Sequence, residues 1–169
     1  MPALEKLKEL KIPLILTSSK TFAELAVLSA ELDLGTPFIV ENGAGVIIPD
    51  GYFSAMPGGL IESDGTWVKS FGPARAEITR KLHKVRADGG FSFRGFAYRS
   101  NSDVAACTWL TEQQAVLARD RQFTEPILWE DNESRWQDFA KPITEEGLCS
   151  IRGGRFIHIT GGGDKGQAM

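Results

Sequence analysis

The first third of the chain alternates short apolar runs with segments of helical spacing. Residues 3–10 predict the end of a helix, and residues 12–17 form a compact apolar run typical of a buried parallel strand. A capping box at 21–24 predicts a helix that ends near Gly35, and residues 37–40 predict another short strand. The order helix, strand, helix, strand indicates part of a parallel α/β sheet.

The pattern changes after residues 46–48, which form a further apolar run. Residues 50–72 are rich in Gly, Ser and Pro without a clear period, and this predicts an excursion out of the sheet. Helices are expected over 74–86 and after the capping box at 111–114. Paired glycines at 153 and 154 predict a hairpin within 149–160, because glycine allows the positive φ of a tight turn. These elements indicate a small α+β unit.

Single residues add smaller expectations. Residues 126–129 predict a strand, and Pro142 predicts a break in the helical stretch 134–146. Cys107 and Cys149 are far apart and lie in apolar surroundings, which favours two buried free thiols over a disulfide or a metal site.

Charge and hydropathy exclude several classes of function. The net charge of -3, with acidic and basic residues mixed along the chain, gives no surface for a polyanion, so nucleic acid is not an expected partner. No apolar run is long enough to span a bilayer, and the N-terminal segment is charged and not apolar. We therefore expect a cytoplasmic protein that does not bind membranes.

Two segments carry candidate phosphate chemistry. Ser18 follows an expected parallel strand, where a hydroxyl and the next helix's N-terminal amides can hold a phosphate, although a serine there can also be only a cap. Lys165 lies between glycines before an expected helix and can balance anionic charge, or can be a solvated loop lysine. The glycines at 161–163 match no nucleotide-binding loop. His83 and His158 are interpreted as structural.

Four strings in this order resemble the mannosyl-3-phosphoglycerate phosphatases of the haloacid dehalogenase-like superfamily. They are LTSSKT (16–21), PFIVENGAGVIIP (37–49), RQFTEPILW (121–129) and GGRFIHITGGGDKG (153–166). The resemblance implies a Rossmann-like core with an inserted α+β cap. It also implies magnesium dependence and hydrolysis of a phosphorylated sugar or glycerate substrate through an aspartyl-phosphate.

The resemblance also assigns site residues. Ser18 and Lys165 match the second and third motifs of the superfamily, as the phosphate-facing hydroxyl and the charge-balancing lysine. The remaining matches are expected on the substrate side, beside Ser18 or facing the cap: Ser19, Glu41, Asn42, Gly43, Arg121, Gln122 and Glu125. A plain turn at 41–43 and an Arg121–Glu125 ion pair without a ligand are the alternatives.

Two family motifs are missing from residues 1–169. The DxDGT string that supplies the attacking carboxylate is absent, and residues 63–66 imitate only its tail. The acidic loop that completes the magnesium site is also absent, so we expect no magnesium to be bound by this chain alone. The expectation is a chain truncated at both ends and not catalytically competent by itself.

The expected organisation is a partial core over 1–57, an α+β cap over 58–157 and a return to the core over 158–169. Loss of the central strand would leave the strand at 14–17 with an unpaired edge. This predicts one of two outcomes: association with another chain, which could be a homo-oligomer through exposed sheet edges, or a cap that folds well beside a loose remnant of the core. The alternatives are a non-catalytic module that binds sugar phosphates and a related sugar phosphatase.

Overall fold

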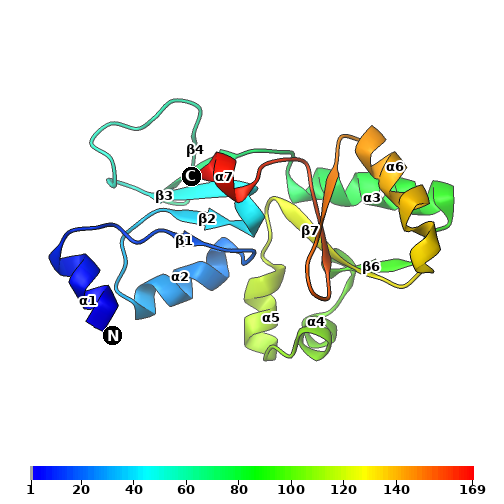
Figure 1. Ribbon diagram of the computed structural model, residues 1–169, viewed down its shortest axis with the longest axis horizontal. Helices are drawn as coiled ribbons and strands as arrows, with labels where there is room; N and C mark the ends of the chain where they lie inside the picture. Colours follow the sequence, from blue (N-terminus) through cyan, green and yellow to red (C-terminus); the bar gives the residue numbers. More distant parts are fainter. Residues whose placement is uncertain (1) are drawn as a thin grey trace.

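The computed structural model describes residues 2–169, and Figure 1 shows two lobes side by side. The sheet of the first lobe has the strand order β1-β2-β3-β5-β4, and that of the second has the order β6-β7-β9-β8. The first lobe consists of α1 (Pro2–Glu9), β1 (Leu16–Thr17), α2 (Phe22–Glu31), β2 (Phe38–Val40), η1 (Glu41–Gly43), β3 (Gly45–Pro49), β4 (Ile61–Ser63) and β5 (Thr66–Ser70).

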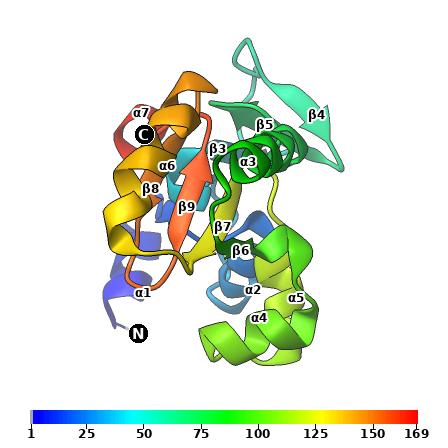
Figure 2. The same ribbon diagram turned by 90° about the vertical axis from the view of Figure 1, so that its right-hand side faces the viewer.

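The second lobe has its helices on the outside, as Figure 2 shows in a view that faces this lobe. Its elements are α3 (Arg75–Gly89), β6 (Phe93–Gly95), η2 (Phe96–Tyr98), α4 (Asn101–Thr108), α5 (Glu112–Arg119), β7 (Thr124–Trp129), η3 (Glu133–Arg135), α6 (Trp136–Glu145), β8 (Cys149–Arg152) and β9 (Ile157–Thr160). The chain then returns to the first lobe and ends with α7 (Lys165–Ala168).

Local signals in the first lobe form as predicted. The Thr21 hydroxyl accepts a hydrogen bond from the Glu24 N–H (3.1 Å), and the Glu24 carboxylate accepts one from the Thr21 N–H (3.0 Å). This capping box begins α2. β1 and β2 pair in parallel, as expected, but β3 is antiparallel to β2. The turn η1 between them is too short for the crossover that a parallel neighbour requires, so β3 extends the sheet in the antiparallel direction.

Residues 61–70 do not leave the sheet. β5 pairs with β3 in antiparallel register from Gly45↔Ser70 to Pro49↔Thr66, and β4 pairs with β5. Val68 on β5 packs against the core of Leu25, Phe38, Val40 and Ile47. The strand pattern at residues 61–70 is short and lies among glycines, so it could not be recognised in the sequence. The range 58–157 expected for the cap therefore includes β4 and β5, two strands of the first sheet.

The second lobe is built on a sheet covered by two helices. α3 and α6 bury Ile78, Leu82, Phe139 and Ile143 against one face of the sheet. The predicted hairpin is present as β8–β9, but neither Gly153 nor Gly154 has a positive φ. Four residues join the strands, closed by a hydrogen bond from the Gly153 N–H to the Phe156 carbonyl (2.9 Å), so a tighter turn is not needed.

Two further expectations are wrong. α6 continues from Trp136 to Glu145 through Pro142, because burial of Phe139 and Ile143 holds the helix against α3 despite the missing N–H. Cys149 is exposed and only Cys107 is partly buried, both as free thiols, because β8 is an edge strand.

β1 lies at the edge of the first sheet, as expected for a strand without a neighbour on one side. Within residues 2–169, no helix has the length and apolar character needed to cross a membrane. The free edge leaves self-association as a prediction.

Candidate functional site

A strained turn follows β2, beside the end of β1. Glu41, Asn42 and Gly43 all have left-handed backbone conformations, with φ values of 50°, 64° and 92°. The Asn42 N–H donates to the Ser18 carbonyl (2.9 Å), and the Glu41 N–H donates to the Lys20 carbonyl (2.9 Å). Two consecutive non-glycine residues with positive φ are uncommon, and such strain concentrates at ligand sites. The strain marks this turn as the place to look for a ligand, and a role of residues 41–43 in binding stays a prediction.

The segment that contains Lys165 packs directly against this turn. A Cβ atom on Gly43 would lie 2.3 Å from the Asp164 carbonyl carbon and 2.5 Å from the Lys165 nitrogen, so only glycine allows the approach. Asp164 caps α7, since its Oδ1 accepts hydrogen bonds from the Gly166 N–H (2.7 Å) and the Gln167 N–H (2.9 Å). Ser18 and Lys165, far apart in sequence, thus flank the same turn.

Polar atoms remain free around the turn. The Asn42 side-chain nitrogen is buried and has no hydrogen-bond partner within the described chain. Ser18 is half-buried and its hydroxyl oxygen accepts only a long hydrogen bond from the Lys20 N–H (3.3 Å), while Lys165 is exposed. Unsatisfied buried donors are costly, so an acceptor at this position would stabilise the structure.

Glu41 and Arg121 join the two lobes through a buried polar cluster. The Glu41 carboxylate accepts hydrogen bonds from the Gln122 N–H (2.7 Å), the Phe123 N–H (3.2 Å) and the Thr124 hydroxyl (2.6 Å). Arg121 Nε lies 3.5 Å from Glu41 Oε2.

The other bonds of Arg121 extend this cluster to the loop after β1. Its Nη2 donates to the Ser19 carbonyl (2.6 Å), and its Nε donates to the Thr124 hydroxyl (3.0 Å). Burial lowers the pKa of the Arg121 guanidinium, and the Glu41 charge opposes this change. Contacts therefore join four of the predicted core and cap residues, Ser19, Glu41, Arg121 and Gln122. Of these, Glu41 and Arg121 are buried, whereas Ser19 and Gln122 are exposed.

Glu125 lies apart from this group. Its carboxylate is 1% exposed, accepts from Arg75 Nε (2.6 Å) and accepts from the Ala97 N–H (2.8 Å). Burial raises the pKa of the Glu125 carboxyl, and Arg75 opposes this effect. The Arg121–Glu125 ion pair weighed from the sequence does not form, because Glu41 and Arg75 are the respective partners. A substrate contact by Glu125 stays a prediction.

Sequence reasoning missed three residues that organise this junction. Arg75 holds Glu125 and also donates from Nη1 to the Arg119 carbonyl (2.7 Å). The Thr124 hydroxyl donates to the Glu41 carboxylate and accepts from Arg121 Nε. The Thr21 hydroxyl donates to the Leu117 carbonyl (2.8 Å). No local pattern marks these contacts, because each joins segments that are distant in sequence.

His158 has the structural character expected for it. Its Nδ1 is buried without a partner within the described chain, and burial, with a smaller contribution from Arg121, lowers its pKa to about 4. The imidazole is therefore neutral at pH 7.

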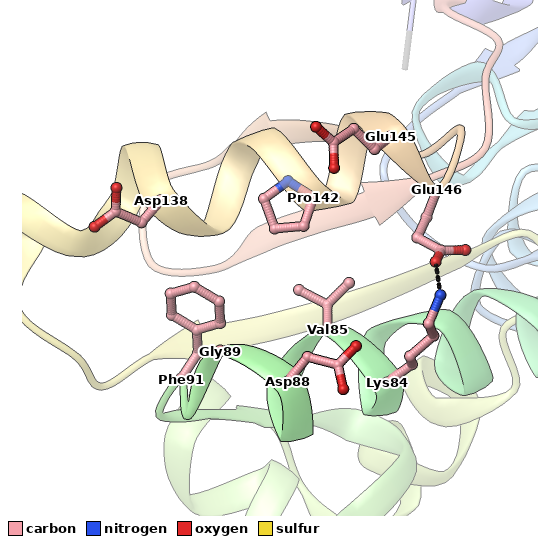
Figure 3. A pocket seen from close by; sticks show the side chains of 9 residues that line it. All are labelled: Lys84, Val85, Asp88, Gly89, Phe91, Asp138, Pro142, Glu145 and Glu146. Atoms are coloured by element: carbon pink, nitrogen blue, oxygen red, sulfur yellow. Dashed lines mark hydrogen bonds and ion pairs between the residues drawn. The ribbon is translucent and has the colours of Figure 1, made fainter.

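A cavity of about 350 Å³ lies between α3 and α6 (Figure 3). None of the site residues predicted from the sequence lines it. Lys84 Nζ lies 2.5 Å from Glu146 Oε1 at one end. Figure 3 shows Asp138 and Asp88 on opposite helices, pointing in different directions. The cavity is lined by Lys84, Val85, Asp88, Gly89, Phe91, Asp138, Pro142, Glu145 and Glu146.

The carboxylates near Ser18 and Lys165 do not fit a magnesium ion. Glu41 is bound by Arg121, Thr124 and two backbone N–H groups, and Asp164 caps α7. Across residues 2–169, no three His, Cys, Asp or Glu side chains gather into a metal-binding group. Magnesium prefers several oxygen ligands in octahedral geometry, which this part of the chain does not offer.

The chain is similar to curated phosphatases along nearly its whole length. It matches no protein-family model. It is 38% identical over 168 residues to a glucosyl-3-phosphoglycerate/mannosyl-3-phosphoglycerate phosphatase of Methanococcoides burtonii, covering 99% of this chain and 62% of that protein. It is 36% identical to a protein of the same name from Persephonella marina, covering 100% of this chain and 62% of the relative.

A mannosyl-3-phosphoglycerate phosphatase of Pyrococcus furiosus is 31% identical, with 99% of this chain and 66% of that protein covered. The chain thus spans about three fifths to two thirds of the length of these relatives.

Solved structures show the same fold. A haloacid dehalogenase-like hydrolase from Bacteroides thetaiotaomicron superposes with a TM-score of 0.59 at 13% identity, covering 98% of this chain and 64% of that one. One from B. subtilis gives 0.55 at 10% identity, covering 99% and 68%. The fold is therefore α/β with a partial Rossmann-like core, and over nearly its whole length the chain is similar to proteins named mannosyl-3-phosphoglycerate phosphatase.

Proposed function

We propose that this polypeptide provides the phosphate-facing turn and the cap of a phosphatase that acts on mannosyl-3-phosphoglycerate. The observation that supports this most is the contact of the Lys165 segment with the turn beside Ser18, which brings two predicted phosphate residues to one place. The names of the relatives suggest the substrate class. Two of those names include glucosyl-3-phosphoglycerate, so we propose it as the alternative substrate.

The proposed roles follow from the chemistry of the side chains. Hydrolysis of a phosphomonoester breaks a P–O bond, transfers the phosphoryl group to water and leaves a proton on the departing hydroxyl. The Ser18 hydroxyl and the Asn42 amide can donate to phosphate oxygens, and the Lys165 ammonium can balance their charge. A magnesium ion, which the resemblance implies, would need carboxylates that residues 2–169 do not bring to this turn, so it is given no role here.

We propose that the 169-residue polypeptide by itself binds the ligand without turning it over. Neither Glu41 nor Asp164 is free to attack phosphorus, because each carboxylate is held by several hydrogen bonds. The DxDGT string is not among residues 1–169. Ser18 and Lys165 can hold an anion but provide no carboxylate for a phosphoenzyme.

The cap residues are assigned different tasks in this proposal. Gln122, which is exposed beside Glu41, would contact the sugar or glycerate directly. Arg121 is a positioning residue, since its guanidinium joins the Ser19 carbonyl to Thr124 and fixes the segment that carries Gln122. We propose that Glu125 acts through Arg75 in the same way.

Calorimetry and a phosphate-release assay test the proposal together. Mannosyl-3-phosphoglycerate should bind the polypeptide saturably, and magnesium should not start phosphate release. Lys165→Ala should weaken binding about tenfold or more, because an ionic contact to phosphate is lost. Lys141→Ala serves as the matched control, since Lys141 is an exposed lysine on α6.

Equal losses for Lys165→Ala and Lys141→Ala would contradict the assignment of the phosphate site. Turnover by the polypeptide alone would contradict the claim that it lacks a nucleophile. Repeating the titration with glucosyl-3-phosphoglycerate ranks the two substrates. A cytoplasmic location and self-association through the edge of β1 also stay proposals, and solution mass tests the latter.

A further inference from the structure

The second sheet has one face that α3 and α6 leave uncovered. Phe93 and Ile127 point into the core beneath these helices. Arg94 follows Phe93, and Leu128 follows Ile127, and the two are partners in the strand register. Because side chains alternate along strands, Arg94 and Leu128 lie on the opposite face. Arg94 forms an ion pair with Glu130. A positively charged group thus marks the uncovered face near the β6 edge.

Arg99 lies beside this edge and is the unusual residue of the region. It follows η2 and is only 8% exposed. Its Nε and Nη2 atoms are buried, and no residue of the described chain accepts a hydrogen bond from either. A buried guanidinium is costly unless its N–H groups are paired, since arginine stays charged in proteins. The chain itself therefore does not supply the acceptors that Arg99 requires.

The same side chain lines a cavity of about 370 Å³, formed by Arg94, Tyr98, Arg99, Asp103, Ala106 and Cys107. The acidic residue of this cavity does not satisfy Arg99, because the Asp103 carboxylate accepts from the Ser100 hydroxyl (2.6 Å) and the Ser100 N–H (3.1 Å). These bonds lower the pKa of Asp103, and Arg99 and Arg94 add smaller contributions. The two arginines and Asp103 thus influence one another electrostatically.

We propose that the Arg99 cavity, defined by these six lining residues, binds a small oxyanion, a phosphate or a carboxylate group. Arg99 lines the cavity, and a planar guanidinium whose Nε and Nη2 lack acceptors can pair with two oxygens of such a group. Arg94 adds positive charge beside it, although part of this charge is used by Glu130. Tyr98, which is 57% exposed, provides a hydroxyl that can donate to a third oxygen. Neither Ser18 nor Lys165 lines this cavity, and binding there does not depend on phosphatase activity.

The test follows the Nε–Hε signal of Arg99 by NMR during titration with inorganic phosphate, and then with glycerate. Working in the Lys165→Ala background removes a contribution from the proposed phosphate site. The Arg99 signal should shift saturably with at least one of the two anions, and which of them acts identifies the source of the oxyanion. Sodium chloride at equal ionic strength should leave it unchanged. A shift that does not saturate, or one reproduced by chloride, overturns the proposal.

Variants give a second readout. Arg99→Gln should weaken oxyanion binding in this background about tenfold or more, whereas Arg80→Gln, at an exposed position on α3, should not. In buffer free of oxyanions, Arg99→Gln should unfold at the same temperature as the parent or higher, because a buried unpaired charge is removed. The stabilisation that phosphate gives the parent should disappear in Arg99→Gln. Equal phosphate stabilisation in both proteins contradicts the assignment.

Discussion

Replacing Glu41 by glutamine should loosen the junction between the two lobes. The Glu41 carboxylate is 1% exposed and accepts from Gln122, Phe123 and Thr124 at 2.6–3.2 Å, with Arg121 at 3.5 Å. Glutamine keeps the shape but has one acceptor oxygen and turns an NH2 group towards these donors. Breaking one side of a buried, hydrogen-bonded ion pair costs about 3–5 kcal/mol. That is a large part of the about 5–15 kcal/mol by which a domain is stable.

Urea unfolding, followed by tryptophan fluorescence and by far-UV circular dichroism, measures this cost. The loss corresponds to a fall of roughly 6–20 °C in melting temperature for a chain of this size. Glu62→Gln is the matched control, because Glu62 lies exposed on β4 and should change stability by less than about 0.5 kcal/mol.

A double-mutant cycle with Arg121→Met separates the pair from the other bonds. The double variant should lose less stability than the sum of the single variants, with a coupling of about 0.5–3 kcal/mol. If Glu41→Gln costs less than about 1 kcal/mol, the reasoning that Glu41 holds the junction is refuted.

Three further changes test other parts of the structure. Gly43→Ala should displace α7, because the new Cβ would meet Asp164 at 2.3 Å, and faster amide hydrogen exchange in α7 with unchanged exchange in β7 is the expected result. His158 has a folded pKa of about 4, below its unfolded value, so its contribution to stability is present above pH 6.5 and lost as pH falls towards 4. His158→Asn should therefore reduce the loss of unfolding free energy between pH 7 and pH 4.5 by about 2–3 kcal/mol, and an unchanged pH profile would contradict this. Pro142→Ala should stabilise the protein by about 1–3 kcal/mol in urea unfolding, because α6 regains a backbone donor, and a loss of stability would show that the proline ring packs usefully.

Much of the secondary structure could be predicted because its signals are local. The capping boxes that open α2 and α5 involve residues three positions apart, and both form in the structure. The apolar spacing of Ile78, Leu82 and Val85 identifies the buried side of α3 for the same reason. β5 was missed because its strand partner, β3, is supplied by tertiary pairing and its own residues are surrounded by glycine and proline.

The candidate site was predicted as a set of residues but not as an arrangement. The strings around Ser18, Glu41, Arg121 and Lys165 could be recognised together, yet their contacts could not be deduced from spacing. Arg121 pairs with Glu41 and Glu125 pairs with Arg75, whereas proximity in sequence favoured a pair between Arg121 and Glu125. Burial decided the outcome, because each charged group needs a partner that the fold brings to it.

By itself, the sequence determined the capped helices α2 and α5, the buried side of α3, the strands at 12–17 and 37–40 and the family resemblance, since these depend on residue types at fixed local spacing. Only the tertiary structure decided the direction of β3, the continuity of α6 through Pro142, the partners of the buried charges and the unpaired state of Arg99. The physical reason is that the pairing of strands and the burial of charged groups depend on which distant segments come into contact, and local sequence patterns do not contain this information.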